Sequence, residues 1–600
     1  MTKNRKRSFW SAVLAVSVTI GFSPVMAQEI TITTTVTDNR SADPVDLTVL
    51  AQPDADNTTV TETAPDTVAD QSPAADADDT ATAAVPAVSL TTGGLRQQNP
   101  SAIRLASLGI TLAPEDNLDR MMWQGSNAAT VLSLYRHLPK TMAVPLLREK
   151  LAQVVLMRSV PPEGSIDLAG EMVEERLNWL AVHVGGEDLA GMIRQLPDSP
   201  EWENWRQWLV LHDLITRNDE AACRLAERRA AETLDAIWHK TNAFCMIIAG
   251  DREKAAFALD IMEDRGVAAP IYFDAMRQLT TGVAPAVIDQ TGADALDLVL
   301  LDSARVDISL DAIRPMQAFA ASLGGLRYLE DEAATLIAAR TFQHGHQPIA
   351  ETLALWALQP VADIPAPEAL TRFSLAEEAD AVALARYHTW QALALEKDAA
   401  AAAQLALEAL IIDFRHSGSR SLDLWMPFMA DGRLNVGPLP GLVPGFERDR
   451  LTDEASAWAD ILAFSARPLT GSTIVNAGAL DAVPVLKAAG LSIEGLDWTS
   501  QFDETARLGD RAISLPLARL EAIDAAAAAG RRAELIMLTA ISLGEMPLHH
   551  LSREDATRII TAFMTVGMEQ TARAMTADIL RGWVLERHLR MAGDADAASS

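Results

Sequence analysis

Residues 218–225 of the 600-residue chain read NDEAACRL, and residues 252–259 read REKAAFAL. The two segments share a polar start, a pair of adjacent alanines and a leucine at the same offset, and they begin 34 residues apart. Self-similarity at such a period is typical of chains that stack one supersecondary unit on the next. The segments therefore predict a repeat architecture.

The period resembles that of the tetratricopeptide repeat, a helical hairpin of about 34 residues. In that family a small residue early in the second helix lets the two helices approach closely, and Ala221 and Ala255 match this position. Trp205 stands where the family often carries Trp in its first helix. The dipeptide Gly250-Asp251 resembles the family's Gly-Asp turn.

A similar Gly-to-Ala spacing returns near the C-terminus, from Gly567 to Ala572. On these residues the chain resembles a divergent tetratricopeptide-like (TPR-like) helical-repeat protein of the bacterial envelope. The resemblance implies an all-α fold, a helical-hairpin α-solenoid, and a function in protein–protein interaction.

Helical periodicity extends over most of the chain beyond residue 99, and alternating strand patterns are nearly absent. Apolar residues recur at i, i+3, i+4 and i+7 in residues 128–138, 172–184, 381–395 and 556–566. Glycines that suit helix C-termini follow several such stretches, namely Gly250, Gly266, Gly530 and Gly567. Ser552 is expected to cap the N-terminus of a helix.

The N-terminus, residues 1–27, has the three parts of a secretory signal peptide. A basic start precedes a short apolar run at residues 12–21, and small residues follow at positions 25–27. The apolar run is about half the length that a membrane-spanning helix needs. We therefore expect cleavage after Ala27 and a periplasmic or secreted mature protein.

The composition then divides the mature chain into segments. Residues 28–98 are rich in Thr, Ala and Asp, and such a segment is expected to be disordered because it buries too little apolar surface. Two helical halves, residues 99–359 and 376–591, are expected on either side of a Pro/Ala-rich linker at residues 360–375. Residues 592–600 are expected to form a disordered tail. Whether the halves form one superhelix or two domains stays open.

The charge balance limits the partners. The chain has 50 Lys and Arg against 81 Asp and Glu, a net charge of −31. Such a surface repels nucleic-acid phosphates and anionic lipid headgroups. We therefore expect no nucleic-acid partner. No segment after the N-terminus approaches 18 uninterrupted apolar residues, so no transmembrane span is expected in the mature chain. No cofactor and no metal are expected either, because no binding motif for them stands out. An envelope protein is the expected partner, and a glycan remains an alternative.

The only two cysteines, Cys223 and Cys245, are candidates for a disulfide. Export would place them where disulfides persist. A turn near residue 234 would hold them at the same height on two antiparallel helices, whose axis distance allows a bridge. The alternative is a pair of small buried hydrophobic side chains.

Four aromatic residues fall on one face of a predicted helix: Trp202, Trp205, Trp208 and His212. Trp202, Trp205 and Trp208 could bind a sugar or a peptide. Packing between hairpins is the more common role of aromatic residues at helical spacing, and we favour it. The pair His344 and His346, with Glu351, could in principle chelate a metal, but a solvated loop is expected there.

Motifs of common hydrolases and of phosphate-binding loops are absent from the sequence. One enzyme alternative remains, an (α/α)-toroid that cleaves cell-wall or extracellular polysaccharides with two carboxylates. Asp423 and Asp497 are its candidate acids, because each lies beside a Trp and near the Gly/Pro-rich loop at residues 437–445. The favoured interpretation is a periplasmic helical-repeat scaffold without catalytic activity.

Overall fold

The computed structural model describes residues 104–110, 113–283, 285, 287–344, 349–359, 361, 363–418, 420–429, 453–464, 468–496 and 512–599. All of them belong to one compact unit, Gly93–Ser600. The predicted signal peptide, the Thr/Ala/Asp-rich segment at residues 28–98, the loop at residues 437–445 and Asp497 lie outside the described residues.

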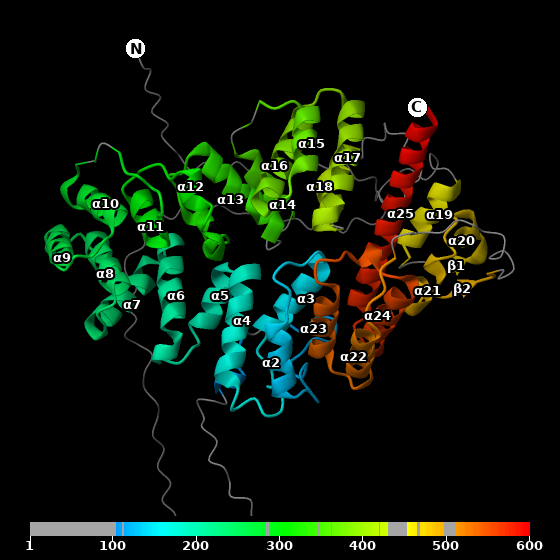
Figure 1. Cartoon of the computed structure of the whole chain (residues 1–600), viewed down its shortest axis with the longest axis horizontal. Coiled ribbons are helices and arrows are strands. Elements are labelled where there is room, and N and C mark those ends of the chain that lie inside the picture. The colour runs from blue at the N-terminus through cyan, green and yellow to red at the C-terminus, as the bar shows by residue number, and fades with distance from the viewer. Residues whose placement is uncertain are drawn as a thin grey trace, which may run out of the picture. The chain divides into compact units, whose positions relative to one another are not determined.

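The described body is all-α, as predicted (Figure 1). Its N-terminal part contains α2 (Ala128–Arg136), α3 (Pro145–Leu156), α4 (Ala169–His183), α5 (Gly186–Ile193), the 3₁₀ helix η1 (Pro200–Trp202), α6 (Glu203–Ile215), α7 (Asp219–Glu232), α8 (Ala236–Ile248) and α9 (Arg252–Asp264). Next come α10 (Pro270–Thr281), α11 (Ala295–Ser303), α12 (Leu310–Ile313), η2 (Gln317–Phe319), η3 (Leu323–Gly325), α13 (Asp331–His344) and α14 (Ile349–Ala357).

The C-terminal part is built from helices that range in length from three to 31 residues. They are α15 (Ala366–Leu375), α16 (Ala379–Leu395), α17 (Ala399–Ser417), α18 (Arg420–Met429), α19 (Asp453–Leu462), α20 (Gly471–Asn476), α21 (Ala482–Ala488), α22 (Leu517–Ala528), α23 (Arg532–Leu543), η7 (Leu548–His550), α24 (Arg553–Thr565) and α25 (Glu569–Ser599). Among the described residues, the only strands are β1 (Leu469–Thr470) and β2 (Ile493–Glu494), which pair in parallel.

Helix ends follow the predicted signals. Gly250, Gly266, Gly530 and Gly567 all have positive φ, between 69° and 86°, in the turn after a helix. This left-handed conformation favours glycine because it has no Cβ. The Ser552 side chain accepts a hydrogen bond from the backbone N–H of Asp555 and so caps α24. The capping prediction is confirmed.

The hairpins α6–α7 and α8–α9 repeat with a spacing of 33 residues. Their first helices begin at residues 203 and 236, and their second helices begin at residues 219 and 252. Arg217 and Gly250 occupy equivalent turns, with φ of 65° and 86°. The equivalent buried alanines are Ala222 and Ala255, whereas Ala221 is only half-buried. The expectation for Ala221 was therefore wrong by one residue, because the adjacent alanines allowed two alignments.

Helices from the two ends of the described chain pack on one another. Helix α3 contacts α23 and α25, and α2 contacts α23 (Figure 1). The carboxylate of Asp116 accepts hydrogen bonds from the backbone N–H groups of Gln570, at 3.0 Å, and Thr571, at 2.7 Å. Asp116 thereby caps α25 from 453 residues away (569 − 116). In a solenoid each repeat contacts only its neighbours, so these contacts lie outside that pattern.

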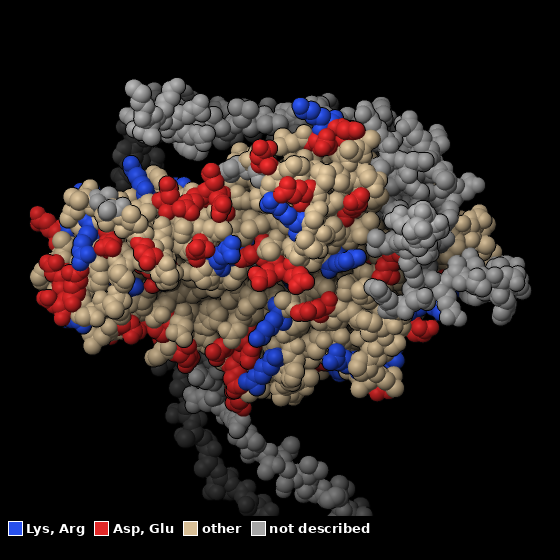
Figure 2. Space-filling view, turned by 45° about the horizontal axis from the view of Figure 1, so that its top comes forward, with Lys and Arg blue, Asp and Glu red and all other residues tan. Residues whose placement is uncertain are grey.

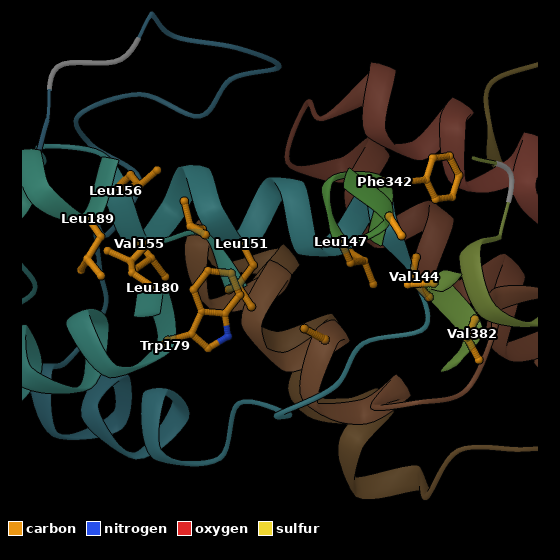
Figure 3. Close-up of a cluster of buried hydrophobic side chains, with 14 of the residues drawn as sticks. Val144, Leu147, Leu151, Val155, Leu156, Trp179, Leu180, Leu189, Phe342 and Val382 are labelled. Atoms are coloured by element: carbon orange, nitrogen blue, oxygen red, sulfur yellow. The ribbon is translucent and has the colours of Figure 1, made fainter. Parts of the chain in front are cut away.

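A single connected core joins the two predicted halves, from Leu108 to Leu585. Figure 3 shows part of it, where Val144, the residue before α3, and Leu147 of α3 lie near Phe342 of α13 and Val382 of α16. Apolar burial of this kind is the main contribution to the stability of a fold. The halves therefore do not form separate cores.

The limits of two predicted segments need correction. The linker predicted at residues 360–375 contains α15, which packs on α16 and α17. Pro365 caps this helix and Pro367 lies in its first turn, where proline favours a helix start rather than an interruption. The tail predicted at residues 592–600 is also partly wrong, since α25 continues to Ser599. Alanine, which recurs there, has the highest helix propensity.

Candidate partner-binding groove

The predicted disulfide between Cys223 and Cys245 is present. Cys223 lies in the first turns of α7 and Cys245 near the end of α8, and their Cα atoms are 5.5 Å apart. The two helices are antiparallel neighbours across the turn at residues 233–235, so the sulfurs meet at the same height. The bridge fixes α8 against α7.

The tryptophan stripe contributes to packing. Trp202 and Trp208 are buried, and Trp205 is half-buried. The Trp208 ring stacks on His212 and Phe319, with centroids 5.1 and 5.4 Å away, and its Nε1–H donates to the carbonyl of Ala318 at 3.1 Å. Trp208 thus attaches α6 to η2, which uses both faces of its ring.

A groove of about 660 Å³ lies along α8 and α9. One wall is a single face of α8, whose lining residues recur every three or four positions, and α9 supplies the other wall. Its lining residues are Leu234, Ala236, His239, Asn242, Ala243, Met246, Glu253, Lys254, Phe257, Ala258, Ile261, Met262, Arg265 and Val267. Two large apolar side chains in it are mostly exposed, Leu234 at 86% and Phe257 at 67%.

The rim of this groove carries charges of both signs, from Glu253, Lys254 and Arg265. The Lys254 ammonium lies 2.7 Å from the carboxylate of Asp251, and this hydrogen bond raises the pKa of Lys254 above its usual value. The lining thus combines apolar side chains with charges of both signs, which suits an amphipathic segment more than a small ion.

Sequence reasoning did not single out Phe257, although a signal exists. With the observed spacing of 33 residues, Phe257 occupies the position of Arg224 in the preceding hairpin. Arg224 is exposed and forms an ion pair with Glu220. A phenylalanine at a position that faces water in the neighbouring repeat indicates a surface with a binding role.

Of the two acids of the enzyme alternative, Asp423 is described, whereas Asp497 lies outside the described residues. Asp423 lies on α18 with much of its surface exposed. The part of its carboxyl group that is shielded from water raises the pKa, and the charges of Arg581 and Arg420 oppose that rise. The adjacent Trp425 is fully buried, and its Nε1–H donates to Asp413 at 2.8 Å. Trp425 therefore offers no face to a sugar ring.

Histidines contribute one cluster. His344 ends α13, and residues 345–348 lie outside the described part. His549, His550 and Glu586 place ligand atoms within 4.8 Å of one another. Two imidazoles and a carboxylate are a donor set that Zn²⁺ accepts, with a fourth position for water. The chemistry of this cluster thus allows a metal ion.

A comparison of the chain with protein-family models, curated proteins and solved structures finds no match. Among the described helices, none combines the length and the apolarity that crossing a bilayer requires. This finding and the disulfide are compatible with an exported protein.

Proposed function

We propose that this protein is an exported, periplasmic helical-repeat scaffold that binds an envelope protein through the groove between α8 and α9. The occupant would be an amphipathic segment of that partner, which lays its apolar face on Phe257 and Leu234. Signal-peptide cleavage after Ala27 and TPR-like stacking of neighbouring hairpins, with the added contacts of α2 and α3 to α23, are parts of the same proposal.

The exposure of Phe257 is the observation that carries this proposal. Phe257 stays 67% exposed in the groove, so a partner that covers it would remove its apolar surface from water. Complete burial of such a side chain contributes roughly 1.5–3 kcal/mol of favourable free energy. Aromatic anchors of this kind dominate the binding energy of many interfaces. The neighbouring Leu234 extends the same apolar surface across the groove.

The rigidity of the groove supports the proposal further. The disulfide joins α7 to α8, and buried alanines bring α7 and α9 close to their neighbours. A wall that is already ordered costs less conformational entropy when it binds. The lining contains a single acid, Glu253, so this groove does not supply the two carboxylates that the polysaccharide-cleaving alternative needs.

Affinity capture from envelope extracts tests this function, with the mature chain and two variants. Phe257→Asp places a charge in the groove, and Leu375→Asp places one at an equally exposed apolar site of α15. We expect the mature chain and the Leu375→Asp variant to recover the same stoichiometric partner. Once that partner is purified, Phe257→Asp should raise its dissociation constant about tenfold or more, because the variant lacks one anchor side chain.

Recovery of an equal amount of the partner by Phe257→Asp would contradict the proposed groove. If no variant recovers a protein partner, while the mature chain degrades purified cell-wall glycan, the scaffold function itself is wrong. Circular dichroism of each variant checks that the helical content is unchanged.

A further inference from the structure

A second cavity, of about 810 Å³, lies away from the groove and is surrounded by helix ends. Helices α3, α13, α16, α17 and α18 contribute to it, together with the end of α4 and the residues before α3. Its charged lining residues are the five cations Lys140, Arg148, Arg386, Arg415 and Arg420 and the two carboxylates Glu377 and Glu545. The ionised lining therefore has a net charge of +3.

This positive cavity contrasts with the chain as a whole, in which acids outnumber basic residues by 81 to 50. On the face shown in Figure 2, acidic side chains cover more of the surface than basic ones. A random share of these charges would give a negative lining. The concentration of arginine in one half-buried place therefore needs a physical reason.

Arg386 supplies an unused donor within this lining. Its side chain is only 2% exposed, and its Nε and Nη2 donate to Asp413 and Ser417, both at 2.9 Å. The buried Nη1 has no hydrogen-bond partner among the residues that the structure describes. A buried donor left without an acceptor costs free energy, and an oxygen of a bound ligand would remove that cost.

Two guanidinium groups are positioned by one ring. Arg386 and Arg420 lie over Phe342, with their Cζ atoms 4.8 and 4.9 Å from the ring centroid. The two positive charges repel each other, and the carboxylate of Asp413, which lies 2.7 Å from Arg386, compensates part of this repulsion. Both side chains line the cavity, so an anion there would face both guanidinium groups.

The titration behaviour of the lining agrees with this geometry. Burial, followed by the charge of Arg420, lowers the pKa of Arg148 to about 10. Burial, followed by the charge of Arg386, lowers the pKa of Arg420. Burial and the charge of Arg386 also lower the pKa of His416. The three side chains thus experience the positive potential of their neighbours, and a pKa of about 10 leaves Arg148 charged at neutral pH.

The uncharged part of the lining limits the size and nature of a ligand. Phe342 and Val382 form an apolar wall, and Figure 3 shows both near Val144, the residue before α3. A volume of about 810 Å³ falls in the range of small-molecule sites, which is larger than an inorganic ion requires.

We propose that this cavity binds a small organic anion, whose phosphoryl or carboxylate group is held by Arg148, Arg386 and Arg420. The body of the ligand lies against Phe342 and Val382. Guanidinium groups suit this task because each can donate two parallel hydrogen bonds to a carboxylate or a phosphate. The site is independent of the groove between α8 and α9.

Calorimetric titration of the full mature chain tests the site, with glucose 6-phosphate and citrate as anionic probes and glucose as the neutral control. We expect at least one anionic probe to bind, more weakly as the salt concentration rises, and glucose to give no signal. The phosphate and carboxylate arms distinguish the two anion classes. Binding of citrate alone would assign the site to carboxylates.

Arg148→Gln and Arg420→Gln should each weaken this binding about tenfold or more, because each removes a charge-assisted contact. The matched control is Arg252→Gln, an exposed arginine on α9 outside the cavity. Circular dichroism confirms folding of each variant. The proposal is overturned if neither probe binds at millimolar concentration, or if the cavity variants bind as tightly as Arg252→Gln.

Discussion

The N-terminus of α25 depends on a carboxylate from the opposite end of the described chain, and replacing Asp116 by Ala tests that dependence. The change removes two acceptors for the N–H groups of Gln570 and Thr571. Loss of a helix cap costs about 1 kcal/mol. Thr571 is buried, with 1% of its surface exposed, and its hydroxyl also donates to Asp116. Without this acceptor the buried hydroxyl would be unpaired, at a cost of another ~1 kcal/mol.

A local loss of about 2 kcal/mol corresponds to roughly thirtyfold faster opening, since 1.4 kcal/mol is a factor of ten. Hydrogen-exchange mass spectrometry of a peptide from residues 569–577 measures it. We expect Asp116→Ala to increase the exchange rate of this peptide by about that factor and Asp116→Asn to increase it less. The control Asp363→Ala changes an exposed residue and should leave the exchange rate unchanged. Unchanged exchange in Asp116→Ala would refute the proposed cap.

Three further predictions concern stability. Replacing both Cys223 and Cys245 by Ser should lower the free energy of unfolding, measured by urea titration, by about 3 kcal/mol. Dithiothreitol should lower the free energy of unfolding of the wild type by a similar amount and leave that of the variant unchanged. Asp413→Ala should cost about 3–5 kcal/mol because it leaves the Arg386 charge buried alone; a change below 1 kcal/mol would show that the pair is unimportant. Burial lowers the pKa of His212 below 6.5, so the unfolded state binds more protons and stability should fall as the pH drops below about 6.5. Melting temperatures at pH 7.5 and 6.0 should therefore differ less in His212→Asn than in the wild type; equal differences would contradict the assignment.

The sequence predicted local features of the fold well. Helical periodicity and glycine at positive φ depend on residues a few positions apart, so short windows predicted the presence of α4 and α24 and the turns at Gly250 and Gly567. Both helices begin three residues before the periodic stretches at residues 172–184 and 556–566. The disulfide followed from the same hairpin geometry. The repeat spacing was misjudged because Ala221 and Ala222 fit the motif equally well, and only burial distinguishes them.

Contacts between distant segments could not be predicted in this way. Asp116 and Thr571 meet only after the whole chain folds, and no pattern in the sequence relates them. Arg148, Arg386 and Arg420 likewise come from three different helices. Their types and spacings are ordinary when each is read alone, so the cavity they share is visible only in three dimensions.

The most direct test of the central claim is photo-crosslinking from within the groove in cells that produce the protein. A photoreactive phenylalanine analogue replaces Phe257 in one variant and Leu375 in another. Our account predicts a discrete adduct with one envelope protein from position 257 and none from position 375. Absence of an adduct at position 257, or the same adduct from both positions, would contradict the account.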